Sequence, residues 1–494
     1  MSEIRTLLRQ SSYYFTGQII IMAAGFISFP ILTRIFSVSD YGILGLITTT
    51  VLIGIAIGKL GFPSSVVRFY AEFESKNQLA SFYSTIFLGS VGLAATISIL
   101  FGCATQLFGN NFIDKNIITL LPLASILIFS GCTLDILSSF FRAQQRPKLY
   151  SLIAIFRRYG SLGLGILFVF YFSKDVFSFV LGQMVSGVII FLSIGYICFR
   201  KRGLTFESFS SEIFRNSIKF GFPLVWAELG HLFLHYSDRY LIQLYLGSAS
   251  LGYYTAGYNL ATYITEMIMY PLNYAISPLY MSILVNKGEG KTKEFFTKSF
   301  RYFLLIMFVI VFGFIAIGKD LISFLATKKY LEAYSILPYV VIGQSIYACT
   351  IILNNGLFIK KKMYIMTYVM LVTCVLSVGV NIILIPKFGI IGAGWTNLIS
   401  NIFYTLVITY YAFREFSFRI DYAHIILYLV SSLVMFIALR NIHFEGQFVN
   451  LIGRIAIGGI IYFTFILVFD KEIRGKIQAF VKNLKNPSGD KNVT

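Results

Sequence analysis

The sequence is poor in charged residues and has no long polar segments. Only 13% of its 494 residues are charged, whereas 57% are hydrophobic and 17% are aromatic. A water-soluble domain carries about a quarter charged residues, so this composition excludes a soluble globular protein, a disordered chain and a fibrous one. The hydrophobic residues suffice for about fourteen membrane spans of about twenty residues each. The sequence therefore predicts an all-α protein that crosses a membrane many times.

Cysteine is also scarce, and its spacing indicates no particular chemistry. The five cysteines lie inside apolar stretches, and none belongs to a CxxC pair or a Cys/His pattern. This spacing predicts neither a disulfide framework nor a zinc site. No polar gap is long enough for a nucleotide-binding or catalytic domain, so we expect no enzyme, no cofactor and no metal. Energy for uphill transport would come from an ion or substrate gradient, or from a partner.

Apolar segments separated by polar gaps predict fourteen spans. The first segment is too long for the core of a signal peptide, so we interpret it as a retained helix. Lys and Arg fall mostly in alternate gaps, which predicts an even number of spans with both termini in the cytoplasm. Topology also explains the net charge of +19, so no nucleic-acid partner is expected. The predicted spans are 12–36, 41–61, 82–108, 117–141, 151–172, 176–199, 218–246, 251–285, 302–318, 334–359, 363–385, 391–413, 422–440 and 451–469.

Two parts of the chain look like copies of each other. The stretch 32–42 (LTRIFSVSDYG) reappears in outline at 242–252 (IQLYLGSASLG), and the basic gap at 142–150 is echoed at 360–364. Both copies start on the same side of the membrane, so the two halves have parallel topology about an axis along the membrane normal. We predict two six-helix lobes, two additional helices and a basic cytoplasmic tail. Their boundaries are 1–209, 210–415, 416–469 and 470–494.

Two matched bundles suit alternating access to a site between them. Such bundles can rock against each other and open the site to one side of the membrane at a time. A channel would instead show a repeated filter loop, which the sequence lacks. The pattern therefore predicts a transporter, and its substrate has to be inferred from the polar groups inside the membrane.

The seventh predicted span is the richest in ionisable residues. Glu228, His231, His235 and Asp238 are spaced three, four and three residues apart and so share one helix face, and Arg239 follows directly. Each such group costs at least about 2.5 kcal/mol at the centre of a span, so the stripe should face the protein interior. It is either a buried, mutually satisfied polar seam or a part of substrate or proton handling, because His and a buried carboxylate can relay a proton.

Other spans carry single ionisable residues. Glu266 fits a coupling role and a structural role equally well, and Asp135 is expected to form an ion pair with Arg142. Arg157 and Arg158 are adjacent and point in different directions, so at most one is expected to face a cavity. The remaining intramembrane cations also have simpler explanations, namely contact with the membrane interface for Arg34 and Arg454 and topology for Lys59 and Arg68.

Several short motifs together resemble one family of membrane transporters. They are 29–34 (FPILTR) with 40–42 (DYG), 61–63 (GFP) with 67–68 (VR), 222–223 (FP) through 237–239 (SDR) to 251–254 (LGYY), and 385–394 (IPKFGIIGAG). This set resembles the polysaccharide transporter branch of the multidrug, oligosaccharidyl-lipid and polysaccharide exporter superfamily. The residues that fall on these motifs are Arg34, Arg68, Asp238 and Arg239.

The resemblance implies twelve core helices plus two more in a bacterial inner membrane. It implies a flippase that moves an undecaprenyl-diphosphate-linked oligosaccharide from the inner to the outer leaflet, for lipopolysaccharide O-antigen, capsule or exopolysaccharide assembly. Membrane lipids, a glycan polymerase and a chain-length regulator would be its partners. We expect substrate binding by Arg34, Arg68, Arg157, Arg158 and Arg239, and coupling or gating by Glu228, His231, His235, Asp238 and Glu266.

Three other functions remain open from the sequence. A cation-coupled multidrug exporter of the same superfamily would favour a cavity of acids and aromatics. A membrane-embedded glycan polymerase or glycosyltransferase would usually need a sizeable loop, and no gap provides one. A scaffold of the glycan assembly machinery that does not transport is the third.

Overall fold

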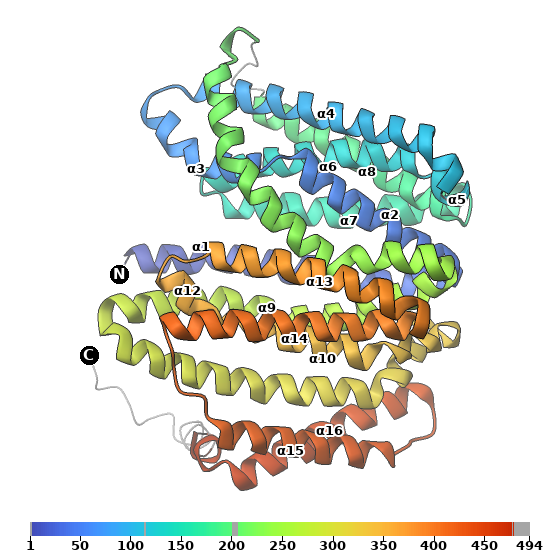
Figure 1. Cartoon of the computed structure of the whole chain (residues 1–494), viewed down its shortest axis with the longest axis vertical. Coiled ribbons are helices and arrows are strands. Elements are labelled where there is room, and N and C mark those ends of the chain that lie inside the picture. The colour runs from blue at the N-terminus through green and yellow to red at the C-terminus, as the bar shows by residue number, and fades with distance from the viewer. Residues whose placement is uncertain (1, 113–114, 200–205, 477, 479–494) are drawn as a thin grey trace, which may run out of the picture.

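The protein, described here as a computed structural model, is a stack of long helices that lie roughly side by side (Figure 1). The structure describes residues 2–112, 115–199, 206–476 and 478. Every regular element in that part of the chain is a helix, as the composition predicts. The elements are α1 (Ser2–Ile35), α2 (Val38–Gly58), α3 (Phe62–Ser75), α4 (Leu79–Phe112), α5 (Lys115–Ile118), α6 (Leu121–Ala143), α7 (Pro147–Tyr171), α8 (Val176–Phe199), η1 (Phe206–Ser208), α9 (Ser211–Ala326), η2 (Lys328–Ser335), α10 (Leu337–Ala348), α11 (Thr350–Leu353), α12 (Asn355–Ile359), α13 (Tyr364–Phe388), α14 (Ile390–Glu415), α15 (Tyr422–Arg440) and α16 (Gln447–Phe469).

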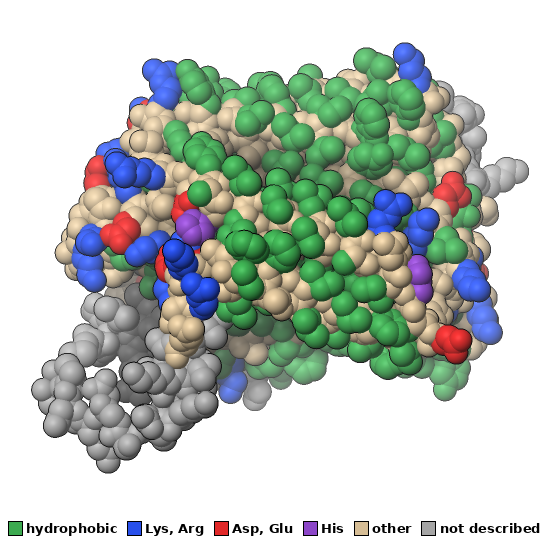
Figure 2. All heavy atoms as spheres, turned by 90° about the horizontal axis from the view of Figure 1, so that it is seen from below, with side chains coloured by type: hydrophobic (Ala, Val, Ile, Leu, Met, Phe, Trp, Pro, Cys, Tyr) green, Lys and Arg blue, Asp and Glu red, His purple; other side chains and the backbone are tan. Residues whose placement is uncertain are grey.

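The helices are long and apolar enough for a membrane. Twelve stretches of the described chain qualify as spans, so the predicted number of fourteen is not confirmed. The stretch 211–278, which carries most of the intramembrane charges, is not among the twelve. Figure 2 shows a face on which hydrophobic side chains fill the middle while charged side chains gather at the two edges. This distribution is that of a multi-pass membrane protein, whose middle contacts lipid.

α9 contains two sharp breaks. Gly247 has φ 78° and Gly288 has φ 75°, a region of backbone conformation that glycine tolerates best. The breaks divide α9 into three segments, 211–246, 248–287 and 289–326. The predicted spans at 218–246, 251–285 and 302–318 fall within these segments.

Two departures from the predicted spans have local causes. The gap predicted at 62–81 contains α3, which starts at Phe62 directly after the left-handed Gly61 and has Pro63 in its first turn. The predicted span 334–359 is divided into α10, α11 and α12 by short interruptions at Cys349 and Asn354. The predicted tail is described only up to 476 and at 478, so most of it lies outside the described residues.

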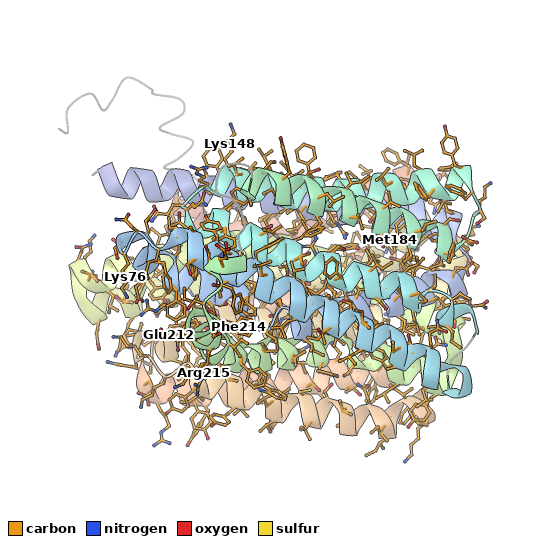
Figure 3. All side chains as sticks on the ribbon, turned by 90° about the horizontal axis from the view of Figure 1, so that it is seen from above. Lys76, Lys148, Met184, Glu212, Phe214 and Arg215 are labelled. Carbon is orange, nitrogen blue, oxygen red and sulfur yellow. The ribbon has the colours of Figure 1, made fainter. Side chains whose placement is uncertain are left out.

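Helices α1–α8 form an N-terminal bundle, and α9–α14 form a C-terminal bundle that packs against it. In Figure 1, α1 begins and α16 ends on the same side of the stack, which we call the terminal side; the other side is the opposite side. Lys76, Lys148 and Arg215 lie toward the terminal side in Figure 3. This placement agrees with the alternate-gap pattern of basic residues, and the cytoplasmic location of that side stays a prediction.

The bundles touch on the opposite side through two glycines. A Cβ on Gly42 would lie 2.7 Å from the backbone nitrogen of Gly252, and a Cβ on Gly252 would lie 1.9 Å from the backbone oxygen of Val38. Gly42 and Gly252 occupy equivalent positions of the sequence repeat. Equivalent residues meet where a two-fold axis passes. The crossing therefore lies where the axis between the predicted repeats is expected.

A second backbone contact lies on the terminal side. Gly61 has φ 73°, and a Cβ there would lie 2.1 Å from the backbone oxygen of Gly221 in α9. Next to this contact, Ser65 Oγ donates a hydrogen bond to the backbone oxygen of Ser217 at 2.7 Å. α2 and α3 thus meet α9 at both ends of the bundle interface.

The last two helices pack against the third segment of α9. Buried Tyr428 and Tyr462 contribute to a hydrophobic cluster there. At the terminal side, Arg301 Nη2 lies 2.6 Å from Asp470 Oδ2 and Nη1 lies 2.5 Å from Glu472 Oε2. Arg301 Nε also donates to the Tyr428 hydroxyl at 2.8 Å. These contacts join α15 and α16 to α9 through one buried guanidinium.

Arg454 makes the corresponding connection toward the opposite side. Its guanidinium forms an ion pair with Asp320 and donates to the backbone oxygen of Leu439 at 2.8 Å. Arg454 is only 5% exposed. The prediction that it contacts the membrane interface is wrong, because its carboxylate partner lies on a neighbouring helix and not at the lipid surface.

Candidate functional site

Each bundle holds a cavity. The N-terminal cavity has a volume of about 490 Å³ and is lined by residues of α1, α2, α6, α7 and α8. The C-terminal cavity has a volume of about 390 Å³ and is lined by residues of α9 and α10–α12. Both lie among predicted spans, and the polar groups that line them are available to a ligand.

The N-terminal cavity is strongly cationic. Lys59, Arg142, Arg157 and Arg158 line it, and Asp135 is the only acidic residue among its lining residues. Both adjacent arginines reach this cavity, so the prediction that at most one would do so is wrong. Their side chains are long enough to overcome the angle between neighbouring positions of a helix.

Asp135 is held by two of these cations. Arg157 Nη1 lies 2.5 Å from Asp135 Oδ1, and Lys59 Nζ lies 3.5 Å from Oδ2. The predicted ion pair of Asp135 with Arg142 is not formed; Arg142 instead donates to the backbone oxygen of Pro63 at 3.5 Å. α7 and the end of α2 lie closer to this carboxylate than the end of its own helix does.

Lys59 also connects the two bundles. It follows the last turn of α2, and its Nζ lies 2.7 Å from Glu228 Oε1 in the first segment of α9. The Lys59 side chain is 15% exposed and the Glu228 side chain 41% exposed. Glu228, the first member of the predicted stripe, thus faces the N-terminal bundle and not lipid alone.

The next two members of the stripe line the C-terminal cavity. The rings of His231 and His235 lie 4.5 Å apart, and His235 Nδ1 shares a hydrogen bond with the Tyr258 hydroxyl at 3.2 Å. Glu266 lines the same cavity. It is the only acidic residue among the lining residues of this cavity, whereas four cations line the N-terminal cavity.

Hydroxyl, amide and aromatic groups complete the C-terminal cavity. Gln344 accepts a hydrogen bond from Thr265 Oγ1 at 2.7 Å and donates one to Thr262 Oγ1 at 2.8 Å. Rings and further amides lie around them and offer donors, acceptors and flat apolar faces. These additional lining residues include Tyr236, Asn273, Tyr347, Asn354 and Asn355.

Asp238 and Arg239 are buried between the bundles and line neither cavity. Asp238 accepts a hydrogen bond from the Tyr254 hydroxyl, and its other oxygen has no hydrogen-bond partner among the described residues. Arg239 donates to Thr49 Oγ1 at 2.8 Å and to Asn259 Oδ1 at 3.2 Å. Arg239 thus joins α2 to two segments of α9. This geometry agrees with the interpretation of Asp238 and Arg239, at the end of the stripe, as part of a buried polar seam.

Arg34 and Arg68 also lie away from both cavities. Arg34 donates to the backbone oxygens of Phe324 and Leu325 at 2.9 and 2.8 Å, near the end of α9. A cation is favourable at a helix C-terminus, where carbonyl groups lack partners. Arg68 is exposed on α3, and its guanidinium lies 5.7 Å from the Phe69 ring centre. Neither arginine lines a cavity, so the expected role of Arg34 and Arg68 in substrate binding stays a prediction.

Lys59 and Arg142 were not among the residues expected to bind substrate. Each lies at the end of a span, where topology alone explains a basic residue. The cavity amides had a clearer signal, because Gln183, Gln344 and Asn354 are polar residues inside predicted spans. Their side chains do line the two cavities.

Comparisons with known proteins agree with the motifs. A family model described as "Polysaccharide biosynthesis protein" matches residues 7–284. An uncharacterized membrane protein of Haemophilus influenzae is 23% identical over 401 residues, which cover 78% of this chain and 94% of that protein. Another, from Methanocaldococcus jannaschii, is 22% identical over 357 residues, which cover 68% and 70%.

Solved structures share the fold. The lipid II flippase MurJ in an inward closed conformation superposes with a TM-score of 0.76 at 17% identity, covering 94% of this chain and 99% of that one. A multidrug resistance MATE family transporter in an inward-facing conformation gives a TM-score of 0.58 at 16% identity, covering 79% and 97%. The matched family model spans more than half of the sequence. The chain therefore belongs to the polysaccharide biosynthesis protein family.

Proposed function

We propose that this protein flips a polyprenyl-diphosphate-linked oligosaccharide from the inner to the outer leaflet by alternating access. The glycan would serve O-antigen, capsule or exopolysaccharide assembly in a bacterial inner membrane. Both termini would be cytoplasmic, and a glycan polymerase and a chain-length regulator would act with it. Membership of a polysaccharide biosynthesis family and the likeness to a lipid II flippase fold support this proposal.

The observation that carries the proposal is the charge of the N-terminal cavity. Four cations, Lys59, Arg142, Arg157 and Arg158, face it against one carboxylate, Asp135. Guanidinium groups bind phosphate oxygens through short, charge-assisted hydrogen bonds. A lipid-linked diphosphate supplies a compact anion that this cavity can hold, while its polyprenyl chain stays among the lipids.

The C-terminal cavity suits the glycan. A sugar hydroxyl left without a hydrogen bond in hydrocarbon costs roughly 2 to 7 kcal/mol, so an oligosaccharide needs polar partners along its path. Gln344, Asn354 and Asn355 supply amide groups, and Tyr258 and Tyr347 supply rings. Protonation of the stripe (Glu228, His231, His235 and Asp238) or of Glu266 would return the empty carrier to the conformation that opens toward the inner leaflet.

Surface glycan tests this proposal. Arg157→Ala removes a cavity cation and leaves Asp135 with Lys59 alone, whereas Lys76→Ala removes an exposed cation outside both cavities. In a strain that lacks the natural gene, the Arg157 variant should give at least about tenfold less surface glycan at equal membrane abundance, since one charge-assisted contact is worth about 1.5–3 kcal/mol. The Lys76 variant should export normally. Equal export by both variants would refute the assignment of the diphosphate site.

A cation-coupled multidrug exporter is the second candidate. Glu266 and the rings of Tyr236, Tyr258 and Tyr347 in the C-terminal cavity would suit an organic cation. Deleting the gene separates the two functions. Loss of surface glycan with unchanged drug susceptibility favours the flippase, and increased drug susceptibility with normal glycan favours the drug exporter.

A further inference from the structure

Lys59 has two carboxylate partners, and they differ in strength and in mobility. Asp135 Oδ2 lies 3.5 Å from Lys59 Nζ and is already bound by Arg157 at 2.5 Å. Glu228 Oε1 lies closer, at 2.7 Å, and forms no other ion pair or hydrogen bond in the described chain. Its side chain is 41% exposed, against 28% for Asp135. Glu228 is thus the closer partner of Lys59 and the one that is freer to move.

Glu228 depends on Lys59 for its position. Lys59 follows the last turn of α2 and so lies at the C-terminal end of that helix. The helix dipole places partial negative charge at this end, which attracts a cation and repels an anion. Without the ammonium group of Lys59, the Glu228 carboxylate would face the negative end of α2 and would be expected to move away.

The same ammonium group lines the cationic cavity. A diphosphate that enters this cavity meets Lys59, Arg142, Arg157 and Arg158, and it would lie close to Glu228. Two anions that share one cation repel each other, and a diphosphate offers more oxygens and more charge than a single carboxylate. The ligand therefore competes with Glu228 for Lys59.

We propose that Glu228 competes with the lipid diphosphate for Lys59. Glu228 holds Lys59 in the empty carrier and releases it when a lipid diphosphate binds. This inference rests on the proposed function. Because Glu228 belongs to α9 and Lys59 to α2, loading the cavity breaks the ion pair between the bundles on the terminal side. A ligand shifts a conformational equilibrium only by binding one state better than the other. The diphosphate binds better to the state in which Glu228 has left Lys59, and this difference in affinity shifts the equilibrium.

The first segment of α9 can bend near Glu228 when the ion pair with Lys59 breaks. Pro223 lies five residues before Glu228 and lacks the N–H group of a regular helical hydrogen bond, so the helix can bend there. Gly221, next to this proline, lies against Gly61 without an intervening side chain. The backbone contact between Gly61 and Gly221 and the Ser65–Ser217 hydrogen bond also lie on the terminal side, and both would remain when the ion pair breaks.

Binding of polyprenyl diphosphate without glycan, to the purified full-length protein in lipid nanodiscs, tests the inference. Glu228→Gln keeps the size of the side chain and removes its charge. A partly exposed ion pair is worth about 0.2–1 kcal/mol, so the variant should bind the lipid about 1.4- to fivefold more tightly. Glu289→Gln is the matched control. Glu289 Oε1 lies 3.1 Å from Lys360 Nζ in an exposed ion pair, and this pair lies outside the cavity. The control should bind as the unchanged protein does.

Two further outcomes separate the inference from the proposed function. If the unchanged protein does not bind polyprenyl diphosphate, the proposed function fails. If it binds and Arg157→Ala weakens binding while Glu228→Gln leaves it unchanged or weaker, only the role of Glu228 is refuted. The exchanged pair Lys59→Glu with Glu228→Lys restores an ion pair but places an acid at the end of α2. It should fold and bind at least about tenfold more weakly, and binding as tight as that of the unchanged protein would overturn the inference.

Discussion

The junction between α9 and the last two helices should depend on Arg301. This residue is 7% exposed, and its partner Asp470 is fully buried. Removing one partner of a buried ion pair costs about 3–5 kcal/mol, because the other charge is left without compensation. Glu472 is 40% exposed, so its pair with Arg301 adds no more than about 1 kcal/mol. We expect Arg301→Gln to cost about 3 kcal/mol, which is more than a hundredfold in the equilibrium for docking α15 and α16.

Thermal unfolding of the purified protein in detergent measures this effect. The control is Lys298→Gln, one turn earlier on the same helix, where an exposed pair with Glu294 at 2.8 Å is worth about 0.3–0.5 kcal/mol. Arg301→Gln should lower the midpoint by several degrees, and the control should change it little. Equal midpoints for the two variants would refute the view that this buried cluster holds the last two helices.

Two more predictions concern pH and packing. Lys476 donates a hydrogen bond to the Glu472 carboxylate and lowers the pKa of Glu472 to about 2. A carboxylate with a lowered pKa stabilises the fold above its unfolded pKa of about 4.3, and this contribution is lost as the pH falls toward 2. The acid-induced decrease in the unfolding midpoint should therefore be smaller in Lys476→Gln, which removes this hydrogen bond. Gly252→Ala would place a Cβ 1.9 Å from a backbone oxygen of α2, so we expect reduced membrane abundance on immunoblots, whereas Gly379→Ala, with nothing within 4 Å, should be normal.

Much of the helical architecture could be predicted because apolar runs separated by polar gaps are local signals. Gly42 and Gly252, which meet between the bundles, end the two copies of the repeat, but the repeat alone does not predict their contact. Helix α3 was missed because its polar and apolar residues alternate in a short stretch that resembles a gap. The predicted number of fourteen spans is not confirmed, since the stretch 211–278 is helical but does not qualify as a span by length and composition.

The partners of charged residues were harder to predict. Residue spacing shows that Asp135 is buried in a span, but its partners, Lys59 and Arg157, come from two other helices. The same holds for Arg454, whose partner Asp320 lies 134 positions away in the sequence. Pairing is a property of how helices pack, and a single sequence carries no direct signal of it.

The two sides of the bundle interface differ in a way that bears on the direction of transport. On the opposite side, Gly42 and Gly252 touch backbone to backbone, and Arg34 contacts carbonyl groups that are fixed in a helix. A ligand cannot replace any of these partners. The terminal side has a backbone contact too, between Gly61 and Gly221, but there Lys59 also contacts Glu228, a side chain that an anion can displace. If the terminal side is cytoplasmic, as the basic gaps predict, the contact that responds to substrate lies where the lipid-linked glycan would enter. Loading would then remove one contact on the entry side first, and the glycine contacts on both sides would have to open by motion of whole bundles.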